Sequence, residues 1–152
     1  MVKSPFVLLP GLDGTGRLFD VFLSALPTGS NVTVVTYPTN GDQNYDTLTA
    51  WAGGFLTDQP CVLVGESFSG PIAVRLAAER PGRVAALVLG ASFIKSPRGV
   101  LLTKVLPLAS ARWVPDFLID YFMASPATPN SVLRTLHELV RQTPAAILRA
   151  RL

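Results

Sequence analysis

Apolar and polar residues form a regular alternation of blocks along the first part of the chain. Short, continuous apolar runs occur at residues 6–9, 61–64 and 84–89, residues 32–36 are rich in β-branched residues, and each stretch ends at a turn signal or a polar segment. Runs of this length are typical of strands buried in a parallel sheet. The segments between them carry apolar residues at helical spacing. This alternation predicts a parallel sheet with right-handed helical crossovers.

Capping residues and prolines mark where the predicted helices begin and end. One covers residues 18–26 and stops at Pro27, a second starts at Asp46 as its cap, and a third covers about residues 67–80. Beyond Ser92 the pattern changes to proline-punctuated helical segments, predicted at 100–109, 114–123, 131–141 and 145–152, with no further strand legible. The sequence thus predicts an α/β core over residues 1–95 and a helical segment over 96–152.

Composition limits the classes of protein that this chain can belong to. Its 152 residues are 49% hydrophobic and 15% charged, which predicts one folded domain with a substantial core. The formal charge of +3 comes from scattered basic residues, so no nucleic-acid partner is expected. Without a signal-peptide pattern or a run of roughly 18 apolar residues, we expect a cytoplasmic protein with no stable membrane insertion. The single cysteine, Cys61, is expected to be a buried strand residue rather than a reactive thiol.

The most specific chemical signal is Ser67. The apolar run 61–64 ends at Gly65, the serine follows two residues later, and the small residues Ser69 and Gly70 precede a helical pattern. A serine on such a sharp strand-to-helix turn is exposed at the end of the sheet as a nucleophile. The strict G-x-S-x-G pattern has glycine where Ser69 stands here. We interpret Ser69 as a small residue that still permits close packing of the helix on the strand.

Backbone N–H groups for a developing oxyanion are also identifiable. One candidate belongs to Phe68, directly after the serine, and a second to Leu12 in the glycine-rich loop 10–16. If the strand order is 2-1-3-4, this loop and the serine turn meet at the switch point where ligands bind in open α/β sheets. Further candidates for substrate binding are Gly11, Asp13 and Glu66. For Glu66 the alternatives are an electrostatic role and a partly solvated position beside the nucleophile.

Segments 8–16 and 65–70 together resemble the oxyanion loop and nucleophile elbow of α/β-hydrolases, especially small esterase- or thioesterase-like members that lack the early strands. The resemblance covers residues 5 to about 93. It implies that Ser67 is the nucleophile, that Leu12 and Phe68 form the oxyanion hole, and that residues 96–152 are a cap. The implied fold class is a truncated α/β-hydrolase core, with a four-stranded parallel sheet in the order 2-1-3-4. The implied activity is carboxylesterase-like, on esters or thioesters with short or medium acyl chains.

The chain departs from that family in its catalytic partners. The family order is serine, then Asp or Glu, then histidine, and the last two follow strands that are not legible here. We therefore expect a core truncated after the cap. His137 is the only histidine. It is either a substitute base, in cis or from a second chain, or a residue at the border of an apolar helix face. Asp116, Asp120 and Glu138 could orient it, although surface or capping roles are commoner for such residues.

The sequence gives little support for phosphate binding, dinucleotide binding or a metal site. Loop 10–16 lacks the ending of a P-loop and the full dinucleotide fingerprint, and one histidine with one cysteine makes no metal site, so neither cofactor nor metal is expected. The exposed edge of the fourth strand predicts a homodimer or higher oligomer, with cap helices that could be exchanged. Two other functions stay open: an impaired hydrolase that binds an acyl ligand or a partner, and an acyltransferase. The apolar residues of the cap either line an acyl pocket, pack on the sheet or another subunit, or face a membrane.

Overall fold

The computed structural model describes residues 4–94 and 115–151, except the side chains of Leu118 and Phe122. The chain forms two compact units, Met1–Pro97 and Arg98–Leu152. Each unit is described by itself below. The first contains the sheet and the predicted serine nucleophile, and the second contains helices and the histidine.

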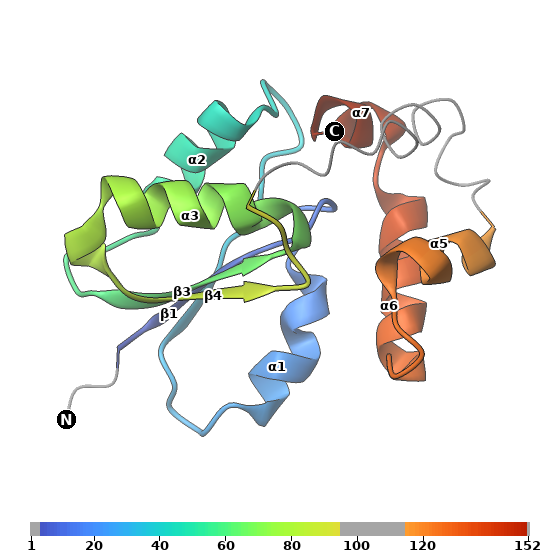
Figure 1. Ribbon diagram of the computed structural model, residues 1–152, viewed down its shortest axis with the longest axis horizontal. Helices are drawn as coiled ribbons and strands as arrows, with labels where there is room; N and C mark the ends of the chain where they lie inside the picture. Colours follow the sequence, from blue (N-terminus) through green and yellow to red (C-terminus); the bar gives the residue numbers. More distant parts are fainter. Residues whose placement is uncertain (1–3, 95–114, 152) are drawn as a thin grey trace. The chain divides into compact units, whose positions relative to one another are not determined.

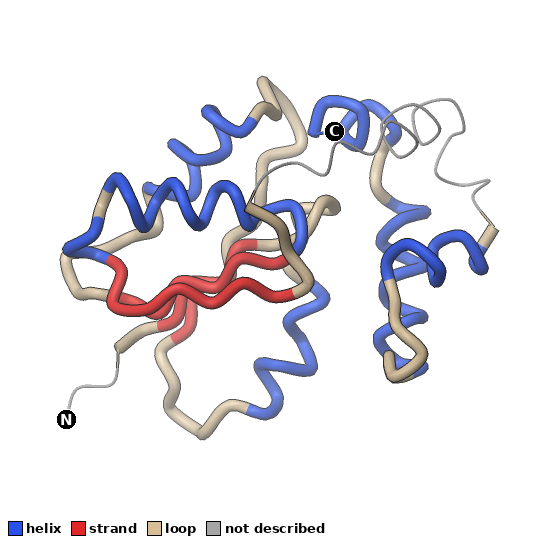
Figure 2. The backbone as a smooth tube through the Cα atoms, viewed as in Figure 1, coloured by secondary structure: helices blue, strands red, loops and turns tan. Residues whose placement is uncertain are grey.

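The first unit is built on a four-stranded sheet in the order β2-β1-β3-β4, in which all neighbouring strands run parallel (Figures 1 and 2). The strands are β1 Phe6–Leu9, β2 Val32–Val34, β3 Cys61–Glu66 and β4 Val84–Gly90. Leu8 of β1 lies opposite Val34 on one side and Val64 on the other. The predicted strand order is therefore confirmed, and the loops after β1 and β3 leave the same edge of the sheet.

Helices cover both faces of this sheet. Figure 1 shows α2 and α3 over one face and α1 over the other. The helices are α1 Asp20–Ala25, α2 Tyr45–Gly53 and α3 Gly70–Glu79, and the 3₁₀ turns are η1 Arg17–Phe19, η2 Ser67–Ser69 and η3 Pro81–Arg83. The predicted helices at 18–26 and 67–80 thus each begin with a 3₁₀ turn. In the second case that turn carries the candidate nucleophile.

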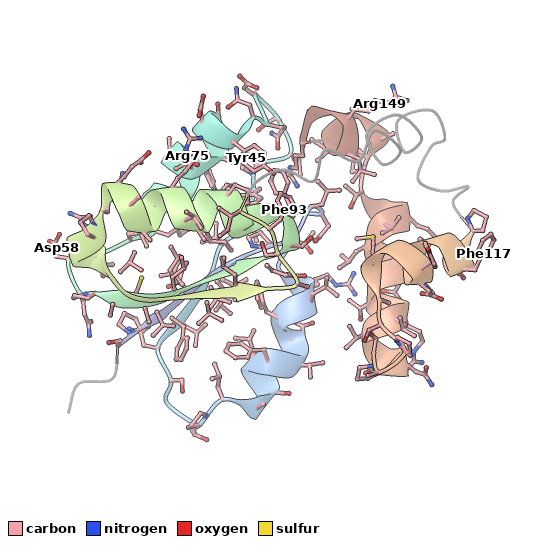
Figure 3. All side chains as sticks on the ribbon, in the orientation of Figure 1. Tyr45, Asp58, Arg75, Phe93, Phe117 and Arg149 are labelled. Carbon is pink, nitrogen blue, oxygen red and sulfur yellow. The ribbon has the colours of Figure 1, made fainter. Side chains whose placement is uncertain are left out.

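The cap of α2 differs from the sequence expectation. Asn44, not Asp46, is the N-cap, and its side-chain oxygen accepts a hydrogen bond from the Thr47 N–H at 2.9 Å. The helix begins two residues earlier than expected, so Asp46 lies in the first turn, where its negative charge interacts favourably with the helix dipole. Asp46 instead pairs with Arg75 of α3 at 2.6 Å, and Figure 3 labels that arginine. Both partners are exposed, so this pair contributes little to stability.

The core of the first unit lies between the sheet and helices α2 and α3. Leu9, Leu48, Leu63 and Ile72 are fully buried there. Cys61 is only 1% exposed, which confirms its expected place as a buried strand residue, and burial raises the pKa of its thiol. Strand β4 is different: residues 85–90 are exposed, although their sequence is as apolar as that of a buried strand. Within the described residues β4 pairs with β3 alone, so it forms an edge of the sheet.

The second unit contains three described helices. They are α5 Asp116–Met123, α6 Asn130–Gln142 and α7 Ala145–Arg151. The predicted helix at 100–109 and Trp113 lie outside the described residues. Leu136 and Leu139 of α6 are buried, whereas Phe117 of α5, labelled in Figure 3, is exposed. Of the helices in described parts of the chain, none is long and apolar enough to cross a membrane.

Close packing of α3 on β3 depends on Gly65. A Cβ at this position would lie 2.8 Å from the Ala73 Cβ and 3.1 Å from the Ser69 backbone oxygen. Both distances are below van der Waals contact. The helix can therefore approach the strand this closely only because residue 65 has no side chain.

We expect Gly65→Ala to lower the free energy of unfolding by about 1–3 kcal/mol, because α3 must shift to accept the methyl group. The measurement is urea unfolding monitored by circular dichroism. Gly82→Ala is the matched control, since a Cβ at Gly82 meets nothing within 4 Å. It should change stability by less than about 0.5 kcal/mol. Equal effects of the two substitutions would contradict the close-packing explanation.

Candidate functional site

Ser67 occupies a strained position between strand β3 and helix α3. Its φ is +46°, in the left-handed region that non-glycine residues rarely adopt. This conformation costs about 1–2 kcal/mol and reverses the chain within a single 3₁₀ turn, η2, before α3 begins. Strain of this kind is concentrated at functional sites. The backbone at Ser67 therefore has the geometry of the sharp strand-to-helix turn that the sequence predicts.

The backbone carbonyl of Ser67 is held by the side chain of Ser92. The chain turns sharply just before Ser92, since Ala91, directly after β4, also has a φ of +46°. The next residue, Ser92, donates its Oγ hydrogen to the backbone oxygen of Ser67 at 2.6 Å. The ends of β3 and β4 are thus fastened together at the candidate nucleophile. Sequence reasoning missed Ser92, because its partner lies 25 residues away and no local pattern marks it.

Gly70 makes room for this contact. A Cβ at Gly70 would lie 2.0 Å from the Ser92 Oγ and 2.3 Å from the Phe93 backbone oxygen, and Figure 3 labels Phe93 beside the start of α3. The small residues after Ser67 were expected to serve the approach of helix to strand. In the structure Gly65 serves that approach, whereas Gly70 accommodates the segment that follows β4.

Ser69 does more than fill a small space. It is completely buried, and its Oγ contacts both the Tyr37 hydroxyl, at 2.5 Å, and the backbone oxygen of Pro10. These partners come from the segment after β2 and from the start of the loop after β1. The expectation that Ser69 matters only through its size is therefore incomplete. Its partners lie 32 and 59 residues away, so they are not visible in a local pattern.

The glycine-rich loop after β1 has a defined conformation. The Gly14 N–H donates to the Gly11 oxygen at 3.0 Å, and the Tyr37 N–H donates to the Gly14 oxygen at 2.9 Å. Asp13 accepts from the Thr15 N–H at 2.8 Å and also contacts the Thr15 hydroxyl. The carboxylate of Asp13, a predicted substrate-binding residue, thus stabilises the loop itself. Leu12 lies within this ordered segment.

Phe68, the other predicted oxyanion residue, has a well-packed side chain. Its ring stacks on Tyr45 of α2 with a centroid distance of 4.9 Å and meets Tyr37 edge-on at 6.3 Å. The side chain is 3% exposed. This packing anchors the residue directly after Ser67 and thereby limits motion of the backbone at the turn.

The carboxyl group of Glu66 is turned toward the loop. Its Oε1 lies close to Gly11, since a Cβ at that residue would be 3.3 Å away, and the Gly11 N–H favours the charged form. Its Oε2 is buried with no hydrogen-bond partner among the described residues. Burial, helped by the nearby charge of Asp13, raises the pKa of Glu66 from 4.5 to about 7. Glu66 as a whole is half-buried, which agrees with the partly solvated position considered for it, although its Oε2 is buried. A carboxyl group with a pKa of about 7 thus lies beside the candidate nucleophile.

His137 belongs to the second unit and contacts two acids of α5. Its Nε2 is 2.7 Å from the Asp120 Oδ1, and its Nδ1 is 3.8 Å from the Asp116 Oδ2. Asp116 is also bonded by Arg141 of α6. Two of the three acids that sequence reasoning considered as orienting groups therefore lie beside the histidine. These contacts also join α5 to α6, as expected of a packing role.

The first unit brings together Ser67, Phe68, Glu66 and the loop that contains Gly11, Leu12 and Asp13. His137 lies in the other unit with its own acidic partners. Across residues 4–94 and 115–151, no group of three His, Cys, Asp or Glu side chains could hold a metal ion. The described site is thus a strained serine beside a glycine-rich loop whose backbone is ordered by hydrogen bonds.

No protein-family model matches the sequence, and no curated protein matches it. Solved structures do match the fold. The N-formylmaleamic acid deformylase of Pseudomonas putida S16 has a TM-score of 0.69 at 15% identity, with 99% of this chain and 64% of that one covered. The esterase RhEst1 from a Rhodococcus species has a TM-score of 0.66 at 18% identity, with coverage of 97% and 64%.

The type II thioesterase BorB, from the borrelidin biosynthetic cluster, has a TM-score of 0.59 at 18% identity and covers 99% of this chain and 61% of its own. The chain thus spans less than two thirds of the length of each of these three proteins. At such low identity the similarity shows the fold alone. Together with the sheet order and the turn at Ser67, it shows that this chain has an α/β-hydrolase-like fold.

Proposed function

We propose that this protein hydrolyses carboxylic esters or thioesters of short or medium acyl chains, with Ser67 as the nucleophile. The observation that carries the proposal is the left-handed backbone of Ser67 at the end of β3. A non-glycine residue held in that strained conformation, between a strand and a helix, is poorly explained by packing alone. The solved esterase and thioesterase of similar fold support this class of substrate.

In the proposed reaction the Ser67 Oγ attacks the carbonyl carbon of the substrate and loses its proton to a base. The backbone N–H groups of Leu12 and Phe68 stabilise the oxyanion of the tetrahedral intermediate. The intermediate collapses to an acyl-enzyme as the base returns the proton to the leaving alcohol or thiol. Water then repeats the sequence on the acyl-enzyme, which releases the acid and restores the Ser67 hydroxyl.

The base in this proposal is His137, supplied by the same chain or by a second copy. Its contact with Asp120 supports the assignment, because a carboxylate beside an imidazole orients the ring and stabilises its protonated form. The second candidate function is binding of an acyl ligand or a partner without turnover. The contact between His137 and Asp120 also favours this second function, because it joins α6 to α5 and such a packing contact requires no catalytic role for His137.

Ser67→Ala should reduce hydrolysis of a p-nitrophenyl short-chain ester by roughly 10³-fold or more, because the acyl-enzyme can no longer form. The assay is initial rates on wild type and variant purified in parallel. Ser30→Ala, which changes a serine in an exposed turn, is the matched control and should keep the wild-type rate. Equal rates for wild type and Ser67→Ala, both near background, would favour the binding function.

The same assay tests the proposed base. His137→Gln keeps the approximate size and polarity of the side chain, and with it much of the packing between α5 and α6, but removes the imidazole that the proposed mechanism uses as the base. If His137 is the base, this variant should lose activity nearly as completely as Ser67→Ala. Unchanged activity in His137→Gln would remove His137 from the mechanism and leave Ser67 with another base.

We also propose that the protein forms a homodimer through the edge of β4. The strand has no charged residue and no proline, and Leu87, Val88 and Leu89 are 36–47% exposed. An edge strand without such protective features pairs readily with another strand. Two copies of β4 related by a two-fold axis can pair in antiparallel fashion.

Sedimentation velocity at micromolar concentration should therefore show a dimer, and Val88→Lys should shift it toward monomer because a charge on the edge opposes strand pairing. Val21→Lys is the matched control, since Val21 is a similarly exposed valine on α1 and should leave the dimer intact. A wild-type monomer, or equal effects of the two lysines, would contradict this interface.

The raised pKa of Glu66 predicts a specific dependence of stability on pH. Between about pH 4.5 and 7 the folded protein holds a proton on Glu66 that the unfolded chain has released. The free energy of unfolding should therefore fall as pH rises through this window, by on the order of 2–3 kcal/mol, and this contribution should be constant above it.

Glu66→Gln keeps an oxygen for the Gly11 N–H but cannot ionise. The difference in free energy of unfolding between Glu66→Gln and wild type should thus grow as pH rises from 4.5 to 7, measured by urea unfolding at several pH values. A difference that is independent of pH would show that the carboxyl group is not held neutral by its surroundings.

A further inference from the structure

We propose that Glu66 and Ser69 are positioning residues. They hold one peptide group of the proposed oxyanion loop, residues 10–16, from its two opposite sides. This inference rests on the proposed function and deepens it. The peptide group joins Pro10 to Gly11. It carries the Pro10 carbonyl and the Gly11 N–H, and it directly precedes Leu12, the proposed oxyanion donor.

The two contacts come from residues that flank the nucleophile. Ser69, two residues after Ser67, bonds the Pro10 carbonyl. Glu66, one residue before Ser67, places its carboxyl group against the Gly11 backbone, where a Cβ would lie 3.3 Å from the Glu66 Oε1, and interacts with the Gly11 N–H. In a trans peptide the C=O and the N–H point in opposite directions. A polar contact on each side therefore limits rotation of the peptide plane more than either contact alone.

The direction of each hydrogen bond at Ser69 follows from the chemistry of its partners. A carbonyl oxygen only accepts, so the single hydroxyl proton of Ser69 is donated to Pro10. The Tyr37 hydroxyl, 2.5 Å from the Ser69 Oγ, must then be the donor to Ser69. Tyr37 thereby fixes the rotamer of Ser69 and leaves its proton directed at the loop. Both hydroxyls lie in the buried core, where an unpaired polar group would be costly.

Two further features suit this arrangement. A Cβ at Gly11 would lie 3.3 Å from the Glu66 Oε1 and 3.5 Å from the Asp13 Oδ1, so glycine lets the Glu66 carboxyl group approach the backbone closely. At the other end of the loop the Tyr37 N–H holds the Gly14 oxygen at 2.9 Å. The segment from Pro10 to Gly14 is thus fastened at both ends, with Leu12 between them.

The consequence is that the loop and the nucleophile move as one body. Preorganised N–H groups stabilise an oxyanion only if they keep their direction while charge develops. Here the same turn that presents the Ser67 hydroxyl also sets the orientation of the backbone leading into Leu12. Loss of the Ser69 hydroxyl should therefore affect the transition state more than binding of the substrate.

The test is hydrogen–deuterium exchange of the full chain, read at the amides of residues 11–16, in wild type, Ser69→Ala and Tyr37→Phe. Ser69→Ala removes the bond to Pro10 and should raise exchange in this loop by roughly 2- to 10-fold. Tyr37→Phe keeps the ring and should give a smaller increase, because Ser69 can still bond Pro10. Ser30→Ala, which loses a hydroxyl bond to the Pro27 oxygen in an exposed turn, should leave the loop unchanged.

An unchanged loop in Ser69→Ala overturns the proposal, as does a uniform increase across β1, β3 and α3, which would mean a general loss of stability. The kinetic arm uses the p-nitrophenyl ester: kcat of Ser69→Ala should fall several-fold with KM nearly unchanged. A rise in loop exchange with unaltered kcat overturns the positioning role. If the wild type does not hydrolyse esters, the proposed function fails, yet the exchange arm still decides whether Ser69 holds the loop.

Discussion

The left-handed conformation of Ser67 is the constraint on which the rest of the site depends. A residue with a Cβ in this region is less stable by about 1–2 kcal/mol than in an ordinary turn, so the surroundings must hold it there. Two features do so. Gly65 lets α3 approach β3 closely, and Ser92 bonds the Ser67 carbonyl across a space that Gly70 leaves open. The strained turn is thus held by the segments that follow β3 and β4.

Buried polar groups give the site its order. Tyr37, Ser69 and Glu66 would each be costly in the core without partners. Tyr37 and Ser69 bond to each other and to the loop after β1, whereas Glu66 keeps one buried oxygen without a partner among the described residues. A neutral carboxyl group tolerates this position far better than a charged one, which explains the raised pKa of Glu66. The arrangement favours a rigid loop and disfavours additional negative charge beside it.

Local patterns in the sequence predicted the strands and the turn at Ser67, because these depend on neighbouring residues: apolar runs for β1 and β3, small residues after the serine. The strand order came instead from the resemblance to α/β-hydrolases, and the structure confirms it. The hydroxyl contacts of Ser69 and Ser92 could not be predicted, since they join segments that come together only after folding. The N-cap of α2 was misplaced by two residues, because Asn44 and Asp46 have equally good capping side chains. The roles of Leu12 and His137 stay predictions.

The two small residues that follow the turn, Ser69 and Gly70, differ in how much space each has for a side chain. In this chain the position that tolerates no side chain is residue 70, while residue 69 carries a hydroxyl that is fully enclosed. The position after the nucleophile that must lack a side chain is thus one residue later than the glycine of the G-x-S-x-G pattern. In this chain the site of a Cβ collision identifies that position, whereas the fixed spacing of glycines points to residue 69. A substitution that restores glycine at 69 would then satisfy the motif and empty a buried hydrogen-bonding site.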